Sequence, residues 1–214
     1  MHDIEVLVHD AQPEHISLYS LTIEEGTKLA EMVDLKSFEP LEETHQAEIL
    51  EACWSILSAL GYDHYEVSNF SKAGVNCQHN LRYWALQPYL GLGPSAVGTV
   101  ATLKGLVRWT GAASIHDYTS TPVFNTYSME KLSSDEEIIE YLLVSLRTKQ
   151  GIDKSIFTQR FNRSFDSMFG RCIKKIRHSN PTWVLDDLVS FSLTEQGWMV
   201  MDGIVLDMVY DAGL

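Results

Sequence analysis

The chain of 214 residues is 45% hydrophobic and 21% charged, which is ordinary for a globular protein and long enough for a real core. No apolar run approaches the roughly 18 residues of a membrane span, and residues 1–15 lack the regions of a secretion signal. The net charge of −13 falls mainly on residues 1–130, where 17 Asp and Glu oppose 6 Lys and Arg. We therefore predict a cytoplasmic protein with no transmembrane segment and no nucleic-acid partner.

The spacing of cysteine and histidine argues against a metal centre. Cys53, Cys77 and Cys172 lie far apart, and such an odd set favours a reducing compartment over a disulfide scaffold. Closed zinc sites usually need two spaced ligand pairs, but no C-x-x-C, H-x-x-x-H or H-E-x-x-H occurs. The C-x₃-C-x₂-C run of an iron–sulfur site, the phosphate-binding lysine motif and the nucleophilic-serine elbow are also missing. We predict no metal ligands and no catalytic residues.

Two β-rich segments predict an α/β layer in the first half of the chain. HISLYSLTI, residues 15–23, alternates in polarity, and YDHYEVSNF, residues 62–70, has the composition of a second strand. A helical segment lies between them, and strand, helix and strand in this order usually form a parallel pair. We predict that residues 1–109 form a parallel or mixed α/β layer, with both segments in one sheet.

The helices predicted between these strands have recognisable ends. Thr27 can N-cap a short helix over 28–33. Pro40 suits the first turn of a longer helix, and Gly61 suits its end. Cys53 falls on the apolar stripe of that helix, which predicts a buried thiol.

Residues 76–109 combine a short helix, a loop and a hairpin. Asn76 can cap a helix through Leu86, and residues 99–109 are typical of a hairpin that turns at Lys104 and Gly105.

The loop YLGLGPSAVG, residues 89–98, carries Gly91, Gly93 and Gly98 and loosely resembles a phosphate-binding loop. Pro94 removes an amide donor from it, and close backbone packing at a strand end is the alternative interpretation.

Residues 131–214 have the pattern of a winged helix: three helices, a two-stranded wing and a closing helix. The predicted caps are a capping box of Ser134 and Glu137, then Asp153, Ser164 and Thr194. Asp186-Asp187 predicts the tight turn of the wing. Because residues 111–130 are rich in Thr, Ser and Pro, we predict domains at 1–110 and 131–214 joined by a linker at 111–130.

Six basic residues lie in and beside the third of these helices: Arg160, Arg163, Arg171, Lys174, Lys175 and Arg177. A winged helix would place nucleic-acid contacts there. The alternative is a solvated basic face, which the acidic chain and the apolar residues of the same helix favour. A winged-helix nucleic-acid-binding protein remains an alternative function.

The segment NCQHNLRYW, residues 76–84, is the main candidate for a binding site. It concentrates side chains that ligate, hydrogen-bond and stack: Cys77, His79, Asn80, Arg82, Tyr83 and Trp84. On a helix, residues 79 and 83 share a face, whereas 82 and 84 diverge, so one ligand cannot meet all six. Cys77 and His79 point about 200° apart and cannot ligate one iron together. A structural role for Tyr83 and Trp84 is the alternative.

Several sequence segments together resemble those of one protein family. HISLYSLTIEEGT, YEVSNFSKAG, CQHNLRYW, YLGLGPSAVG and SLTEQGW occur in the order found in oxygen-independent coproporphyrinogen III oxidase-like proteins, and most closely resemble the heme chaperone branch, HemW. The resemblance covers nearly the whole chain, and C-x-H-N-x-x-Y-W is its most specific element. It implies the C-terminal part of a partial (β/α) radical S-adenosylmethionine (SAM) barrel, followed by the winged-helix-like domain.

The resemblance also implies cofactors that this chain is not expected to hold. Family members carry a [4Fe–4S] cluster and S-adenosylmethionine, and the cluster cysteines lie upstream of the residues present here. We expect a C-terminal fragment that binds heme or porphyrin and is inactive alone as an oxidoreductase. Its parent would be a chaperone that passes heme to an acceptor protein, or a true coproporphyrinogen III oxidase of porphyrin biosynthesis. A truncated barrel edge would favour self-association.

For the motif, the resemblance implies a heme or porphyrin site. His79 would ligate the iron or hydrogen-bond to its ligand, Arg82 would pair with a propionate, and Tyr83 and Trp84 would stack on the macrocycle. Cys77 and Asn80 complete this set. Because barrel sites lie at the carboxyl ends of strands, further candidates are Tyr19, Glu24, Gly91 and Gly93.

Overall fold

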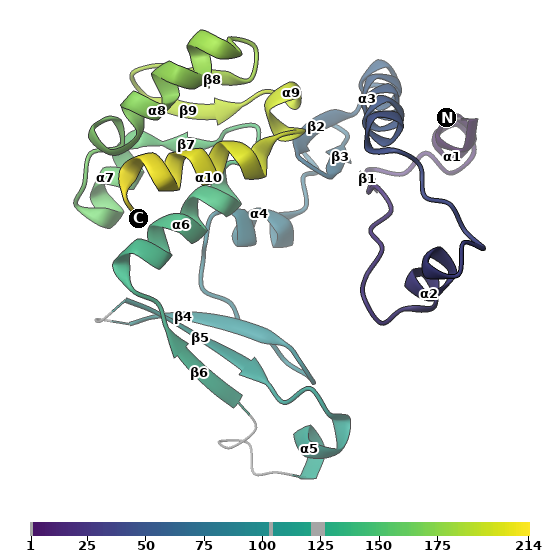
Figure 1. The fold of residues 1–214 in the computed structure, drawn as a ribbon, viewed down its shortest axis with the longest axis horizontal. Coiled ribbons are helices and arrows are strands. Elements are labelled where there is room, and N and C mark those ends of the chain that lie inside the picture. The colour runs from purple at the N-terminus through teal and green to yellow at the C-terminus, as the bar shows by residue number, and fades with distance from the viewer. Residues whose placement is uncertain (1, 103–104, 121–126) are drawn as a thin grey trace. The chain divides into compact units, whose positions relative to one another are not determined.

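The computed structural model describes residues 2–102, 105–120 and 127–214, and its contacts divide the chain into two compact units, residues 1–77 and 78–214 (Figure 1). Both units are mixed α/β structures with small sheets. The N-terminal unit consists of α1 (His2–Ala11), β1 (His15–Ser17), α2 (Lys28–Asp34), α3 (Glu43–Ala59), β2 (Asp63–Glu66) and β3 (Asn69–Ser71).

The sheet of the N-terminal unit has the order β1-β3-β2, and both neighbouring pairs are antiparallel. The prediction that 15–23 and 62–70 share a sheet is confirmed, but the predicted parallel pairing is wrong. The reason is that 62–70 is two strands. The chain turns between Glu66 and Asn69. The side-chain amide of Asn69 donates a hydrogen bond to the buried Glu66 carboxylate. β3 therefore takes the place beside β1, which ends at Ser17 instead of continuing to 23.

Helix α3 contributes three residues to the apolar core of this unit. Cys53, Trp54 and Leu57 are buried on it, which confirms the prediction of a buried thiol. The Trp54 ring lies 4.8 Å from His64, and His64 stacks on Phe70 at 4.0 Å. The helix thus packs on the β2–β3 hairpin through aromatic side chains.

The helix ends in this unit follow local chemistry. Ala30 donates its N–H to the Thr27 hydroxyl at 3.2 Å, so the predicted cap of α2 is confirmed. Gly61 has φ +87° just beyond α3, a conformation that glycine adopts without strain. The predicted start of α3 is wrong, because the helix begins at Glu43 and Pro40 precedes it.

The C-terminal unit has two antiparallel three-stranded sheets, ordered β4-β5-β6 and β7-β9-β8. Its elements are α4 (Gln78–Trp84), β4 (Val97–Thr102), β5 (Gly105–Gly111), α5 (Ile115–Ser120), β6 (Tyr127–Lys131), α6 (Ser134–Ser145), β7 (Ile152–Asp153), α7 (Lys154–Phe161), α8 (Phe165–Ser179), β8 (Val184–Asp186), β9 (Ser190–Leu193), α9 (Glu195–Trp198) and α10 (Met201–Ala212).

The predicted hairpin at 99–109 is confirmed by the pairing of β4 with β5, in which Thr102 lies opposite Gly105. Lys104, in the predicted turn, lies outside the described residues. The segment 111–130, predicted as a linker, includes α5 and most of β6, and β6 pairs with β5. The domain boundaries stay a prediction.

The predicted caps after residue 130 are largely confirmed. Asp153, Ser164 and Thr194 cap α7, α8 and α9. The capping box of α6 is formed by Ser133 and Glu136, one residue before the predicted pair, because Ser134 is already helical. The predicted single last helix is two, α9 and α10, with a break around Val200.

The β8–β9 hairpin is confirmed, although its turn is longer than predicted. The Asp187 carboxylate accepts hydrogen bonds from the N–H groups of Val189 and Ser190, each at 2.7 Å. β7 adds a third strand through Ile152 and Phe191. The order α6–β7–α7–α8–β8–β9 agrees with the predicted pattern, and the winged-helix assignment itself stays a prediction.

The corner between β9 and α9 is stabilised by two residues of the segment Leu193–Trp198, Thr194 and Gly197. Thr194 donates its hydroxyl to the carbonyl of Thr182 at 2.7 Å and accepts the N–H of Gly197 at 3.1 Å. A Cβ on Gly197 would lie 2.1 Å from the Trp183 carbonyl oxygen, so only glycine fits. The Trp198 indole N–H then donates to the Leu146 carbonyl at 2.8 Å.

Several basic residues of this unit form ion pairs within it. Arg171 and Lys175 bind Asp211 at 2.8 and 2.9 Å, while Arg163 binds Asp135 at 3.1 Å. Arg177 lies 3.5 Å from the Asp186 carboxylate. These pairs favour the solvated-face interpretation of the basic residues over nucleic-acid contacts.

The ion pairs of Asp211 predict an acid-sensitive contribution to stability. Hydrogen bonds from Arg171 and Lys175 lower the pKa of Asp211 from 3.8 to about 2. A lowered pKa in the folded state stabilises the fold above pH 3.8, and this stabilisation is lost as the pH falls through about 2. In urea denaturation between pH 5 and 2, Asp211→Asn should therefore flatten the decline in unfolding free energy. Parallel pH profiles for the two proteins would contradict this.

Candidate functional site

The residues of the C-x-H-N-x-x-Y-W motif fall in both units. Cys77 ends the N-terminal unit, where its N–H donates to the Tyr65 hydroxyl at 3.3 Å and that hydroxyl lies 2.9 Å from His15 Nε2. The other five candidate residues lie on α4, in the C-terminal unit. Cys77 is half-buried against its own unit, which suits a structural thiol.

One side of α4 carries His79 and Tyr83, and Tyr89, which follows the helix in the chain, extends them to an aromatic row. The His79 and Tyr83 rings meet edge-on with centroids 4.7 Å apart, and Tyr83 meets Tyr89 in the same way at 4.5 Å. The prediction that 79 and 83 share a face is therefore confirmed. His79 is exposed and Tyr83 is half-buried, so the imidazole is accessible beside an aromatic surface. Asn80, half-buried, follows His79 on the same helix.

The other side of α4 borders a cavity of about 770 Å³, which we call the arginine groove. Arg82 and Trp84, which were predicted to diverge from the face shared by 79 and 83, both line it, together with Leu81 and Ala85. Its other lining residues are Gln78, Gln87, Tyr141, Ser145, Thr148, Gln150, Gly151, Asp153, Ile156, Arg160 and Ser190.

Two arginine–aromatic contacts form beside this groove. The Arg160 guanidinium lies 5.5 Å from the Tyr141 ring, and the Arg147 guanidinium lies 5.5 Å from the Trp84 ring. Burial raises the pKa of Tyr141, although a hydrogen bond with Ser145 and the charge of Arg160 oppose this. The site thus combines planar cations with aromatic faces, which suits a flat anionic molecule.

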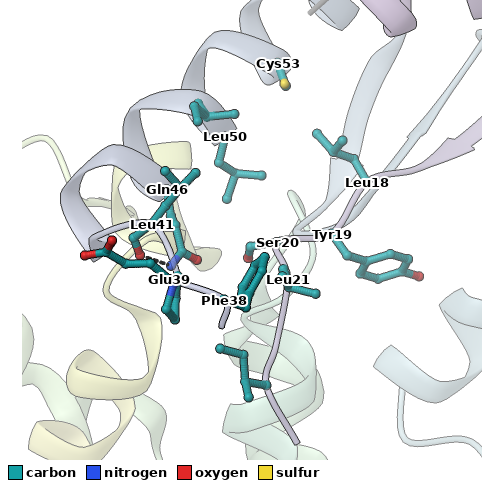
Figure 2. Close-up of a pocket in the computed structure, with 13 residues that line it drawn as sticks. Leu18, Tyr19, Ser20, Leu21, Phe38, Glu39, Leu41, Gln46, Leu50 and Cys53 are labelled. Atoms are coloured by element: carbon teal, nitrogen blue, oxygen red, sulfur yellow. Dashed lines mark hydrogen bonds between the residues drawn. The ribbon is translucent and has the colours of Figure 1, made fainter. Parts of the chain in front are cut away.

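A second cavity, of about 380 Å³, lies in the N-terminal unit between residues 18–23 and α3 (Figure 2). Its lining is mainly apolar and includes Leu18, Leu50 and Cys53. Tyr19 borders it but is 69% exposed, and in Figure 2 its ring points away from Leu50.

The four candidate barrel-site residues are divided between the two units. Tyr19 lines the apolar cavity, whereas the Glu24 carbonyl accepts the Thr27 hydroxyl at 2.7 Å, where α2 begins. Gly91 and Gly93 belong to the other unit. A Cβ on Gly91 would lie 2.0 Å from the Val97 carbonyl oxygen, which supports the interpretation of close backbone packing.

The residues present do not fit an iron–sulfur cluster. Cys53 and Cys172 are buried in separate units, and Cys77 is half-buried. Across residues 2–102, 105–120 and 127–214, no three Asp, Glu, His or Cys side chains gather as metal ligands. Within the same ranges, no helix has the length and apolar character needed to cross a membrane.

Comparison with solved structures identifies the class of fold. The chain resembles the coproporphyrinogen III oxidase HemN from Escherichia coli, described as a radical SAM enzyme, with a TM-score of 0.68 and 15% identity. The match covers 99% of this chain and 51% of that structure. The chain therefore has the mixed α/β fold found in this part of a radical SAM protein.

Sequence comparison identifies the family. The heme chaperone HemW of Lactococcus lactis is 30% identical over 185 residues, 86% of this chain and 47% of that protein. HemW of Bacillus subtilis is 30% identical over 166 residues, 76% of this chain and 43% of that protein. The chain belongs to the HemW/HemN-like radical SAM family, and it spans about half the length of the curated relatives it matches. No family model matches it.

Sequence reasoning did not identify all the residues of the arginine groove. In the sequence, Arg160 stands out only as one of six basic residues. Tyr141 and Arg147 belong to no motif that indicates a binding site. The groove joins α4, α6 and α7, which are distant in the sequence. No short motif could have connected them.

Proposed function

We propose that this chain belongs to a radical SAM heme chaperone and binds heme or a porphyrin through α4. The observation that carries the proposal is the exposed His79 beside Tyr83, within the motif most specific to the resemblance. The curated relatives named heme chaperones support it. His79 ligates the iron, Tyr83 stacks on the macrocycle, and Arg82 pairs with a propionate.

The geometry limits which motif residues take part. Trp84 lies on the groove side of α4 and does not share a face with His79 and Tyr83. Cys77 precedes α4 and its N–H donates to the Tyr65 hydroxyl, so the proposal gives it a structural role and not that of an iron ligand. Asn80 remains a candidate contact. The iron–sulfur and S-adenosylmethionine chemistry of the family has no part in this proposal, because this chain offers no thiolate cluster.

The alternative is that the parent protein is a coproporphyrinogen III oxidase. The fold similarity to HemN favours this reading, and both proteins would handle a tetrapyrrole. We further propose a winged-helix-like domain from α6 onward, a cytoplasmic location and transfer of heme to an acceptor protein. The order of the elements supports the winged-helix-like domain. The three free cysteines support the cytoplasmic location, because thiols stay reduced there.

A heme titration followed at the Soret band tests the proposal. The wild-type chain should bind heme, and His79→Ala should weaken binding and shift the band, because an axial ligand is lost. If His79 only orients another ligand, affinity should change about 10–100-fold with less spectral change.

The matched control is His116→Ala, since His116 is also exposed but lies on α5, outside the motif. It should behave as the wild type does. An identical spectrum and affinity in wild type and His79→Ala would remove His79 from the site. Tyr83→Ala then tests stacking alone, and tighter binding of coproporphyrin than of heme would favour the oxidase alternative.

A further inference from the structure

We propose that the arginine groove binds the carboxylate-bearing edge of the porphyrin, with Arg82 and Arg160 as its guanidinium partners. The inference rests on the proposed function and deepens it, because it adds Arg160, a residue outside the motif, to the carboxylate recognition proposed for Arg82. Arg160 lies on α7, 78 positions beyond Arg82, and both line one cavity. The ligand class is a planar tetrapyrrole with free carboxylates.

The first argument is the distribution of charge. The chain carries a net charge of −13, and Arg163, Arg171, Lys175 and Arg177 all have carboxylate partners. Among the described residues, no Asp or Glu forms an ion pair with Arg82 or Arg160. Two guanidinium groups without carboxylate partners among the described residues, in one concave site, suit carboxylates supplied from outside, which guanidinium binds in bidentate fashion.

The second argument concerns the one carboxylate in the lining, that of Asp153. Its Oδ1 accepts the N–H groups of Ser155 and Ile156 at 2.8 and 2.9 Å, together with the Ser155 hydroxyl at 2.6 Å. The hydrogen bonds from Ser155 and Ile156 lower the pKa of Asp153. Asp153 therefore caps α7 and, among the described residues, forms no ion pair with Arg82 or Arg160, although its charge still acts on the neighbouring Tyr141.

The third argument is shape. Arg160 lies over the Tyr141 ring, an arrangement that holds a guanidinium plane while its edge N–H groups stay available to an acceptor. Trp84 adds a second aromatic wall with Arg147 against it. The volume of about 770 Å³ is within the range of about 300–1,000 Å³ for sites that bind small molecules.

The fourth argument links the groove to the aromatic row. Arg82 is three residues after His79, and side chains at this spacing are neighbours on a helix surface. Arg82 also lines the groove together with Arg160, so it is the residue that the neighbourhood of His79 and the groove have in common. A porphyrin with its iron at His79 can thus extend its carboxylates past Arg82 into the groove.

Metal-free protoporphyrin IX and its dimethyl ester test the inference without any contribution from iron. Wild type should bind the free acid at least about 10-fold more tightly than the ester, since a hydrogen bond between charged groups contributes on the order of 1.5–3 kcal/mol. Arg160→Gln and Arg82→Gln should each weaken binding of the acid about 10-fold and leave the ester unchanged. Arg160→Lys should lose less, because it keeps the charge but not the planar fork. Porphyrin fluorescence measures each affinity.

The matched control is Arg163→Gln, which removes the same charge from an exposed residue just beyond α7, outside the groove. It should bind the free acid as wild type does, and circular dichroism should show that every variant is folded. An equal loss in Arg163→Gln would attribute the effect to net charge and overturn the inference. Unchanged affinities in both groove variants would also overturn it.

The outcomes separate this inference from the proposed function. If the groove variants have no effect but His79→Ala still weakens heme binding, only the groove assignment fails. If the groove variants weaken porphyrin binding while His79→Ala leaves heme binding unchanged, iron ligation fails and the groove stands. If wild type binds neither heme nor porphyrin, both proposals fail.

Discussion

Replacing Phe157 with alanine should lower the free energy of unfolding of the C-terminal unit by about 3–5 kcal/mol, as for other buried aromatic residues. Phe157 is fully buried, and its ring lies 4.9 to 6.0 Å from those of Tyr141, Phe161, Phe165 and Phe169. The substitution would leave a cavity where α6, α7 and α8 meet. Urea denaturation followed by circular dichroism measures the change.

A neighbouring position on α7 provides the control for Phe157. Gln159 is exposed on the same helix, and Gln159→Ala should change the free energy of unfolding by no more than about 0.5 kcal/mol. A loss below about 1 kcal/mol in Phe157→Ala would show that the aromatic cluster can close around the missing ring. The described packing would then not be the main source of stability in this unit.

Replacing Lys154 with methionine is expected to have the second largest effect. The Lys154 ammonium lies 2.7 Å from Asp166, 2.8 Å from Asp186 and 2.6 Å from the Asp187 carbonyl oxygen. Removal of one partner from a fully buried pair costs about 3–5 kcal/mol. Because Asp186 is 20% and Asp166 61% exposed, we expect a smaller loss, on the order of 2–3 kcal/mol.

The pH at which Lys154→Met is measured follows from the pKa of the lysine. Burial by itself lowers this pKa, but hydrogen bonds to Asp166 and Asp186 outweigh burial, and the net shift is upward from 10.5. The stabilisation is therefore complete below pH 10.5 and is lost as the pH rises above the folded pKa, so urea denaturation at pH 7 detects all of it. Lys174→Met, an exposed change on α8, should be nearly neutral. Equal effects of the two substitutions would contradict the role of Lys154.

The sequence predicted features that depend on a few adjacent residues. Thr27, Asp153 and Ser164 cap the expected helices because an N-cap needs only a side-chain oxygen and the N–H groups that follow it. The capping box of α6 was predicted one residue too late, at Ser134 instead of Ser133. Both residues are serines, and only the structure shows that the backbone is extended at 133.

Features that depend on distant contacts were predicted less well. The turn after Glu66 contains neither glycine nor proline, so residues 62–70 have the composition of one strand. Strand order then depended on β3 pairing with β1 across more than 50 positions. The shared face of His79 and Tyr83 follows from helix periodicity, whereas the presence of Arg82 and Arg160 in one groove depends on how α4, α6 and α7 pack.

The corner formed by Thr194 and Gly197 affects how homologues of this chain should be classified. The threonine closes a turn, and the glycine makes room for the Trp183 carbonyl. Neither residue touches the arginine groove or the aromatic row. A homologue that has the L-T-x-x-G segment is therefore expected to form the same corner. The segment gives no information about the ligand of that homologue. A search built on this segment would collect proteins of shared architecture, and the proposed ligand would have to be tested separately at positions 79, 82 and 160.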